Sequence, residues 1–380
     1  MSLVANRIRN EIESHGAIPF ARFMELALYA PGEGYYETHE QIGRAGDFIT
    51  SVSVGNLFGE ILAFQFAEWF EESVKDQADS DPIADTMTRF QIVEAGAHDG
   101  RLALDILNWL GANRPQLFER LEYCMIEPSV SRQTWQQKTL DNFQNVSWVK
   151  ELSAISRNIR VNRIIFSNEL FDAMPVHRFG WNQQTKTWFE WAVGWDGKSF
   201  TWKRALENQR SAVPFPNVDP ALLEVLPDEF TTEVCPRATE WWTEASRLCG
   251  IHSCRTGRMV AVDYGLLDEQ LFVPERRQGT LRAISHHHTN ADLLSMPGEQ
   301  DITAHVNFSA LQRAGESAGL STDAVVSQSR FLTGIVERGL KKNGVSHLRD
   351  SWDSARRRQF QTLTHPEHFG RAFRVLVQSR

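Results

Sequence analysis

The sequence predicts an α/β protein in which helices wrap a parallel sheet. Three observations support this fold class. From residue 90 onward, short apolar runs alternate with amphipathic helical segments, the pattern of parallel strands joined by helical crossovers. Residues 1 to about 75 have the periodicity of helices almost throughout. Residues 177 to about 218 change to two-residue alternation around Asp196 and Gly197, which is typical of a β-hairpin.

The N-terminal region is predicted to be a helical cap. A first helix covers residues 3–15, and a second begins through Pro19 and ends before Pro31, because proline fits the first helical position but cannot continue a helix. The stretch "PGEGYYE" then indicates a turn. A glycine-containing loop follows, and it leads into a third helix whose broad apolar face extends to Phe70. The polar and acidic residues 75–88 are predicted to be a linker.

The strands of the core follow in chain order. "FQIVEAG", "EYCMIEPS", "VSWVK" and "NRIIFSNELFD" are predicted strands, with helices over 101–111 and 131–142 between them. The hairpin follows, then a helix over 219–250, then the buried strand "GRMVAVDYG". "STDAVVSQSRFL" and "FRVLVQS" are expected as two more strands. These elements divide the chain into a cap (1–85), a core (86–176 and 255–380) and a hairpin-and-helix insertion (177–254).

Composition excludes several classes of protein. The net charge of −8 argues against a general nucleic-acid binder, whose affinity rests on basic surface. Four cysteines without a C-x-x-C pair, and three consecutive histidines at 286–288, do not have the ligand spacing of a metal site, so no metal is predicted. Neither a signal peptide nor an apolar run of 18 residues is found. We therefore expect a cytoplasmic protein without membrane insertion.

A candidate ligand site begins in "VEAGAHDG", between a predicted strand and a helix. Ligands of parallel α/β sheets bind at the carboxyl ends of strands, and glycine allows the backbone to approach them closely. The dinucleotide pattern G-x-G-x-x-G is absent, which disfavours a nicotinamide-dependent oxidoreductase. Glu94 could instead hold the amino-acid end of S-adenosylmethionine while the Gly96 turn packs on the sugar. The alternative is a helix-entry turn that binds no ligand.

Two further groups of polar residues end neighbouring predicted strands. Glu127 follows the next strand, where a carboxylate can accept both hydroxyls of a ribose; alone, it is equally an exposed loop acid. Asn168, Glu169 and Asp172 follow "RIIF", and carboxylates there could orient a guanidinium through paired hydrogen bonds. The alternative for this group is that Asn168 caps a short helix.

These segments together resemble the S-adenosylmethionine-dependent methyltransferases related to the mitochondrial arginine methyltransferase of complex I assembly, and their bacterial homologues. The resemblance lies in "IPFARFMELALYAPGEGYY", "GDFITS", "FGEILA", "VEAGAHDGRLALDIL", "SNELFDAMPVHRF", "DYG" and "GTLRAISHH...PGEQDITAHVNFSAL". It implies a Rossmann-like class I sheet of seven strands, the last antiparallel, with "DAVVSQSRFL" and "FRVLVQS" as strands six and seven.

The resemblance also assigns residues to roles. It places the cofactor turn at Glu94, Gly96, Ala97, His98 and Gly100, the ribose acid at Glu127, the signature after strand four at Asn168, Glu169 and Asp172, and a loop over the cofactor pocket at Gly46, Asp47, Phe48 and Thr50. The chain departs from the family pattern twice. It has Gly96, Ala97, His98 where the family usually has G-P-G, and "TSVSVG" where it usually has T-S-P-E-I-S.

The sequence is therefore interpreted as an S-adenosylmethionine-dependent methyltransferase that acts on arginine in a protein substrate. Asn168, Glu169 and Asp172 are the predicted catalytic residues. The two departures leave open an alternative, a non-catalytic assembly or binding factor that retains the fold.

Overall fold

The computed structural model describes residues 2–39, 50–78, 89–157, 161–216, 218–250, 256–285, 288–342 and 352–380. The chain forms two compact units. The first unit comprises Met1–Phe48, Phe171–Glu240 and Gly265–Ala310, and the second comprises Ile49–Leu170, Trp241–Tyr264 and Leu311–Arg380. Residues 265–310, expected in the core, thus belong with the N-terminal helices and the hairpin.

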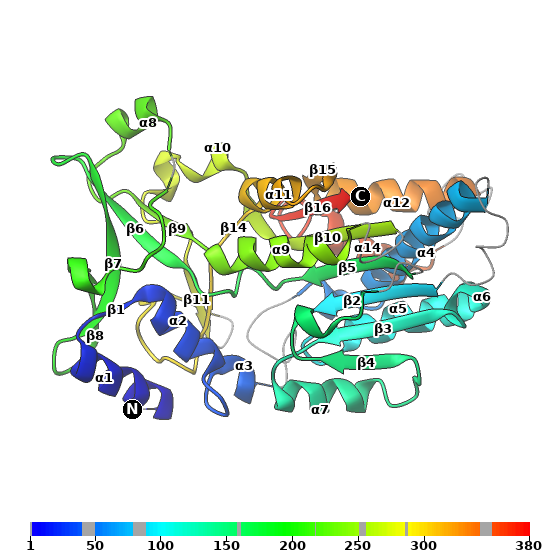
Figure 1. The fold of residues 1–380 in the computed structure, drawn as a ribbon, viewed down its shortest axis with the longest axis horizontal. Coiled ribbons are helices and arrows are strands. Elements are labelled where there is room, and N and C mark those ends of the chain that lie inside the picture. The colour runs from blue at the N-terminus through cyan, green and yellow to red at the C-terminus, as the bar shows by residue number, and fades with distance from the viewer. Residues whose placement is uncertain are drawn as a thin grey trace. The chain divides into compact units, whose positions relative to one another are not determined.

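The second unit contains the predicted sheet (Figure 1). Its strands are β2 (Arg89–Ala95), β3 (Leu121–Ile126), β4 (Val146–Val149), β5 (Val161–Asn168), β10 (Thr256–Leu266), β15 (Ser321–Ser327) and β16 (Phe373–Ser379). Their order is β15-β16-β10-β5-β2-β3-β4. β4, β3, β2, β5 and β10 pair in parallel, whereas β16 is antiparallel to both of its neighbours. The expected seven strands, with the last antiparallel, are confirmed, and one short strand described below pairs with β10 as an eighth.

Helices cover both faces of this sheet. On one face, α4 (Leu57–Ala78), α5 (Arg101–Asn113), α12 (Gln328–Lys342) and α14 (Ser354–Thr364) share an apolar core with the strands. Val375 and Val377 of β16 point into that core. Gln378 alternates to the other face, where it bonds to Trp242 of α9 (Pro236–Leu248) and to the Gln312 carbonyl of α11 (Phe308–Ser317). Every residue of β5 is buried, which explains its continuous apolar character in sequence.

Shorter elements complete the second unit. They are the helix α6 (Pro115–Phe118), the helix α7 (Val130–Thr139), and the 3₁₀ turns η1 (Val52–Val54) and η3 (Leu152–Ala154). α7 joins β3 to β4, as the strand and helix alternation predicts. No helix among the described residues is both long and apolar enough to cross a membrane.

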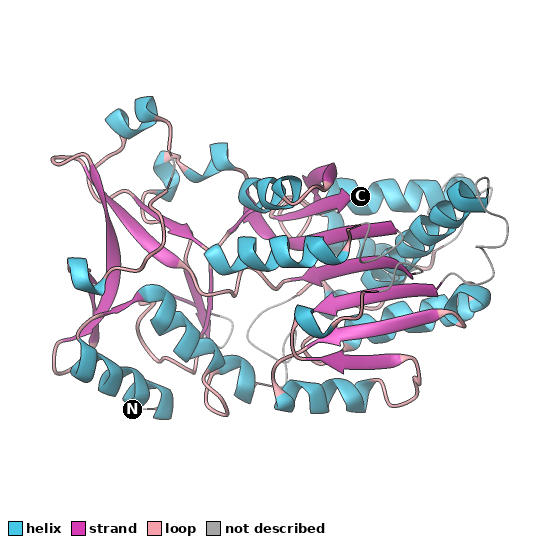
Figure 2. Cartoon of the chain, viewed as in Figure 1, coloured by secondary structure: helices cyan, strands magenta, loops and turns pink. Residues whose placement is uncertain are grey.

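The first unit is built on a five-stranded sheet of order β1-β7-β6-β9, in which β8 also pairs with β7 (Figure 2). Its strands are β1 (Ile18–Pro19), β6 (His177–Asn182), β7 (Thr187–Trp195), β8 (Phe200–Arg204) and β9 (Thr231–Val234). β7 and β8 form the predicted hairpin, with Asp196 and Gly197 in its turn. The apolar faces of α1 (Leu3–His15) and α2 (Phe20–Tyr29) pack against Val193 of β7. The N-terminal helices and the hairpin therefore share one core.

Residues 265–310 add small elements to the first unit. β11 (Arg282–Ser285), β12 (His288–Asn290) and β13 (Asp301–Thr303) form a three-stranded sheet of order β12-β11-β13. β14 (Val306–Asn307) pairs with Gly265 and Leu266 at the end of β10. The remaining elements are α3 (Tyr35–Thr38), η4 (Glu207–Gln209), α8 (Pro220–Val225), α10 (Asp268–Leu271) and η5 (Pro274–Arg276).

Four sequence predictions of secondary structure were wrong in part. The helix expected over 219–250 is α8, then β9, then α9, because Thr231, Thr232 and Val234 are β-branched and pair with β6. The strand expected over "STDAVVSQSRFL" ends at Ser327, where α12 begins. "PGEGYYE" turns at 31–34 and then forms the short helix α3. Of the predicted linker, residues 75–78 continue α4 and the rest lies outside the described residues.

Candidate active site

The predicted site residues of the second unit gather at one edge of its sheet. In the parallel register, Ala95 of β2 lies beside Ile126 of β3 and Ser167 of β5. The three strands therefore end at the same level, with Glu94, Glu127 and Asn168 at their carboxyl ends. Open α/β sheets bind ligands at such an edge.

The turn after β2 depends on backbone conformations that favour glycine. Gly96, His98 and Gly100 have φ values of 78°, 44° and 84°. A Cβ atom at Gly96 would lie 3.0 Å from Leu170 Cδ1, a tight contact, so a side chain there would be strained by the positive φ and would displace Leu170. Gly100 then forms the N-cap of α5. The backbone N–H groups of the first turn of α5 consequently lie at the same sheet edge.

Glu94 is buried, with 2% of its surface exposed. The Tyr123 hydroxyl donates a hydrogen bond of 2.6 Å to Glu94 Oε2 from the neighbouring strand β3. Burial raises the pKa of Glu94 to about 7, because the charged form loses its solvation, although the Tyr123 hydrogen bond opposes this effect. A cationic group placed beside Glu94 would favour the ionised form.

Glu127 is equally buried, but it is held by several donors. Its Oε1 accepts from the Ser129 N–H and from Arg132 Nε, both at 2.9 Å, and its Oε2 accepts from Gln136 Nε2 at 3.1 Å. Burial raises the pKa of Glu127, and the charge of Arg132 opposes that shift. The alternative of an exposed loop acid is therefore wrong.

Gln136 of α7 ties Glu127 to the turn after β2. Its Nε2 also donates to the His98 carbonyl at 3.0 Å, and its Oε1 accepts from Trp148 Nε1 at 2.9 Å. The backbone that carries His98 and the carboxylate of Glu127 are thus fixed by one amide side chain. A substitution at Gln136 would disturb both.

The His98 side chain is half-buried, but its two ring nitrogens, Nδ1 and Nε2, are buried and lack hydrogen-bond partners among the described residues. The ring lies 5.9 Å from that of Trp135. Burial lowers the pKa of His98, so the ring is neutral at physiological pH and offers one donor and one acceptor. Buried polar atoms in native proteins are nearly always satisfied, so these two nitrogens indicate a ligand or water.

Asn168 is the last residue of β5, and Glu169 follows it in a strained backbone conformation that several hydrogen bonds hold in place. Glu169 has φ 52°, and its N–H donates to the Val262 carbonyl at 2.9 Å. Its Oε1 accepts from the Ser51 N–H at 3.0 Å and from Asn168 Nδ2 at 3.1 Å, which fixes the direction of the carboxylate. Asn168 Oδ1 is buried without a partner among the described residues. No helix begins at Asn168, so the alternative of a helix cap does not apply.

The other predicted residues are placed as follows. Thr50 forms a reciprocal turn with Ser53, in which each backbone N–H donates to the other hydroxyl, at 3.0 and 3.1 Å. Asp172 belongs to the first unit, where its carbonyl accepts from the Ala304 N–H at 2.8 Å. Ala97 is buried in the turn. Gly46, Asp47 and Phe48 lie outside the described residues.

Sequence reasoning missed several residues that support the site. They are Ser51, Tyr123, Arg132, Gln136 and Asp263. Asp263 is fully buried and accepts from the Leu170 N–H at 3.1 Å and from the Tyr264 N–H at 2.8 Å, which holds the segment after β5 against β10. Its signal in sequence was the acid of "DYG" at the end of a buried strand, whereas Gln136 carries no such signal.

These side chains fit the chemistry of S-adenosylmethionine. Two buried carboxylates, Glu94 and Glu127, suit an ammonium and a pair of ribose hydroxyls respectively. The unpartnered polar atoms of His98 and Asn168 lie in the segments at the same sheet edge and supply further donor and acceptor capacity.

Comparison with curated proteins finds relatives along nearly the whole chain. The Drosophila melanogaster protein named "Protein arginine methyltransferase NDUFAF7 homolog, mitochondrial" is 26% identical over 98% of this chain and 84% of its own length. The Homo sapiens protein of the corresponding name is 27% identical over 85% of this chain and 70% of its own length. These relatives are mitochondrial proteins, so the predicted cytoplasmic location is contradicted.

The family itself is established by a match over most of the chain. Residues 61–326 match the family described as "Putative S-adenosyl-L-methionine-dependent methyltransferase". A crystal structure from Burkholderia thailandensis, bound to S-adenosyl-homocysteine, is 28% identical, with a TM-score of 0.77 over 99% of this chain and 92% of that one. The chain belongs to this family of methyltransferases, and its cofactor is S-adenosylmethionine.

Proposed function

We propose that this enzyme methylates an arginine side chain of a protein. The relatives of known name are protein arginine methyltransferases, and their similarity extends over 85% to 98% of this chain. The observation that carries the proposal is the fixed carboxylate of Glu169 at the end of β5, beside the residues that suit the cofactor. A carboxylate of fixed direction binds a planar guanidinium through paired hydrogen bonds.

On this proposal each residue of the turn has a role in holding the cofactor. Glu94 pairs with the α-amino group, Glu127 accepts the ribose hydroxyls, and the Gly96 turn approaches the sugar. The neutral ring of His98 donates or accepts one hydrogen bond. Gly46, Asp47, Phe48 and Thr50 are proposed as further cofactor-binding residues, as the resemblance implies. S-adenosylmethionine supplies an electrophilic methyl group bound to a positively charged sulfur.

The acceptor is held by the residues after β5. Glu169 orients the guanidinium, Asn168 keeps the Glu169 carboxylate in place through its amide, and Asp172 is proposed to contribute a second carboxylate. In the transfer that S-adenosylmethionine would supply, the sulfur–carbon bond would break as the N–C bond forms, S-adenosylhomocysteine would leave, and the guanidinium would lose one proton to solvent. Positioning supplies much of the rate in such an in-line transfer. Glu169 and Asp172 therefore act by orientation and by charge.

Calorimetric titration with S-adenosylhomocysteine tests the cofactor residues. Glu127→Gln keeps the size of the side chain but removes its charge, so we expect about tenfold weaker binding or more, since a hydrogen bond to a charged group contributes roughly 1.5–3 kcal/mol. The matched control is Glu122→Gln, an exposed carboxylate on the same strand, which should bind as the wild type does. Equal affinities for both variants would contradict the role of Glu127.

Mass spectrometry tests the reaction. The proteome of a host that lacks this protein is compared after complementation with the wild type or with Glu169→Gln. We expect at least one methylarginine that only the wild type restores, while Glu169→Gln still binds S-adenosylhomocysteine. If no methylated residue differs between these samples, the alternative of a non-catalytic assembly factor replaces the proposal.

A further inference from the structure

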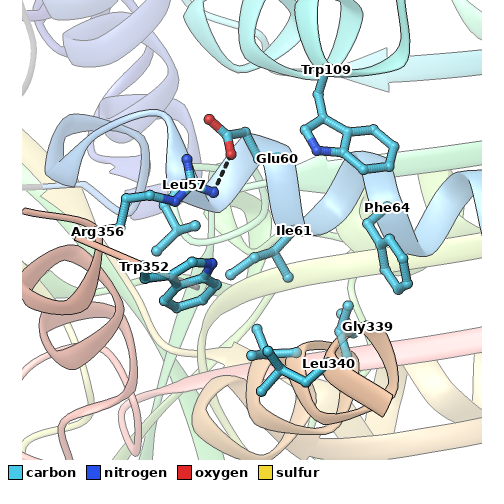
Figure 3. Close-up of a pocket in the computed structure, with 11 residues that line it drawn as sticks. Leu57, Glu60, Ile61, Phe64, Trp109, Gly339, Leu340, Trp352 and Arg356 are labelled. Carbon is cyan, nitrogen blue, oxygen red and sulfur yellow. Dashed lines mark hydrogen bonds and ion pairs between the residues drawn. The ribbon is translucent and has the colours of Figure 1, made fainter. Parts of the chain in front are cut away.

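A cleft runs between four helices of the second unit, apart from the residues of the candidate active site. It consists of two adjoining pockets between α4, α5, α12 and α14, which share Glu60, Trp109 and Arg356. The first pocket has a volume of about 190 Å³ and apolar walls (Figure 3). Six side chains form most of these walls: Leu57, Ile61, Phe64, Trp109, Leu340 and Trp352. Because a cavity of about 150 Å³ accepts benzene, this pocket is large enough for a leucine or phenylalanine side chain.

The second pocket is polar, with a volume of about 420 Å³. Asn56, Asp105, Asn108 and Asn113 lie around it. Asparagine side chains can both donate to and accept from the backbone of an extended peptide. Peptide-binding sites often combine an apolar pocket, which binds a side chain, with polar groups that bond to the peptide backbone.

The charges of the cleft are unbalanced. Arg356 forms an ion pair with Glu60, as Figure 3 shows, and Asn56 donates to the same carboxylate at 2.6 Å. The Asp105 side chain has no hydrogen bond and no ion pair with any described residue, so the residues that line the second pocket include two carboxylates and one cation. Burial and the neighbouring charge of Glu60 raise the pKa of Asp105 to about 6, and Arg101, one turn earlier on α5, opposes this shift but is itself ion-paired with Asp99. A second cation at Asp105 would remove this repulsion.

We propose that the cleft docks a segment of the protein substrate in which an apolar side chain stands near a lysine or arginine. The apolar side chain fills the first pocket, and the cation pairs with Asp105. That the occupant is the substrate rests on the proposed function and on position. Glu60 lies in the first turn of α4, and Asp105 is five residues beyond Gly100, about 7.5 Å along α5. A docked segment thus begins close to the sheet edge that holds the cofactor residues.

The helix α12 offers a matched pair of variants. A Cβ atom at Gly339 would lie 3.5 Å from Phe64, an ordinary contact, so Gly339→Leu extends a side chain into the apolar pocket. Gly334 lies on the same helix but does not line the pocket, and its Cβ would meet only Arg338, at 3.6 Å. Replacing a helical glycine favours the helix, so both variants should fold. Asp105→Asn removes the charge with almost no change in shape.

Fluorescence anisotropy of labelled nonapeptides with the full-length chain measures the docking. The panel places leucine one to four residues from arginine in a Gly/Ser background, and matched peptides carry leucine with glutamate or serine with arginine. We expect the leucine and arginine peptides to bind best at one spacing, with about tenfold weaker binding to Gly339→Leu and about fivefold weaker binding to Asp105→Asn. Gly334→Leu should bind as the wild type does.

Two results would overturn the proposal. One is equal binding of all peptides to the wild type and to Gly339→Leu. The other is that the wild type is a dimer by light scattering while Gly339→Leu is a monomer, because the cleft would then hold a second copy of the chain. Both measurements are made without cofactor. They are therefore independent of the calorimetric and proteomic tests of methyl transfer.

Discussion

The carboxyl of Glu94 is expected to reduce the stability of the folded chain as pH rises. It is buried beside Tyr123, and its pKa is raised to about 7 from a usual 4.5. The folded state thus holds a proton that the unfolded state releases at lower pH. Glu94→Gln keeps the shape of the side chain and an acceptor for the Tyr123 hydroxyl but cannot ionise. The difference between the variant and the wild type isolates the titration of this one group.

The magnitude follows from the rise of the Glu94 pKa from 4.5 to about 7. Each unit corresponds to about 1.4 kcal/mol, so Glu94 costs the folded state roughly 3 kcal/mol once it is fully ionised. Below pH 4.5 the carboxyl is protonated in both the folded and the unfolded state, so it costs no stability. Between pH 4.5 and 7 it ionises only in the unfolded state, so the free energy of unfolding falls, and the loss is nearly complete above pH 7. At pH 5 Glu94→Gln should exceed the wild type in free energy of unfolding by under about 1 kcal/mol. At pH 8 the excess should be about 3 kcal/mol.

Urea denaturation at pH 5, 6, 7 and 8 measures this difference, with Glu122→Gln, at an exposed carboxylate on β3, as a control. In parallel, Glu94→Gln should weaken S-adenosylhomocysteine binding, because its neutral amide cannot form an ion pair with the α-amino group. A stability difference independent of pH would refute the argument about burial. Wild-type affinity in Glu94→Gln would refute the binding role alone, so the two parts can fail separately.

Three further substitutions, with Gly111→Ala as a control, test the turn and the segment after β5. Gly96→Ala should lower the free energy of unfolding by about 1–2 kcal/mol in urea, because of its positive φ and the contact with Leu170, whereas Gly111→Ala within α5 should raise it by up to about 1 kcal/mol. Asp263→Asn should cost about 1–3 kcal/mol in the same assay, since the amide can accept only through its oxygen. His98→Ala should weaken S-adenosylhomocysteine binding about tenfold in calorimetry, and unchanged affinity would mean that its unpartnered nitrogens face water.

The sheet could be predicted from sequence because its strands are buried on both faces. β5 is buried along its whole length, so its apolar run stands out between polar loops. β9 was missed because it is only four residues long, contains Glu233, and lies between two helices, so the surrounding helical pattern dominated the prediction. Its pairing with β6 decides its conformation, and that partner lies about fifty residues earlier in the chain. Local propensity carries no information about such a contact.

Some residues of the candidate site could likewise be predicted from sequence, and others could not. Residues at strand ends, such as Glu127, could be found because a parallel sheet brings successive strand ends to one edge. Gln136 could not, since its role depends on bonds to Glu127, His98 and Trp148, which only the folded chain brings together. Supporting residues such as Gln136 are identified by their contacts in the folded chain. In the sequence, Gln136 is one of several glutamines in a polar helix.

The candidate site contains residues whose backbone conformation is unfavourable for their residue type. His98 and Glu169 are two of five described non-glycine residues with positive φ, and each follows the end of a central strand. Such a conformation costs roughly 1–2 kcal/mol, and it persists only where surrounding bonds enforce it. Gln136 holds the His98 carbonyl, and the Val262 carbonyl holds the Glu169 N–H. Glycine or asparagine would adopt these conformations at lower cost. A histidine and a glutamate there, at the carboxyl edge of the sheet, are therefore the residues at which a functional role is most expected.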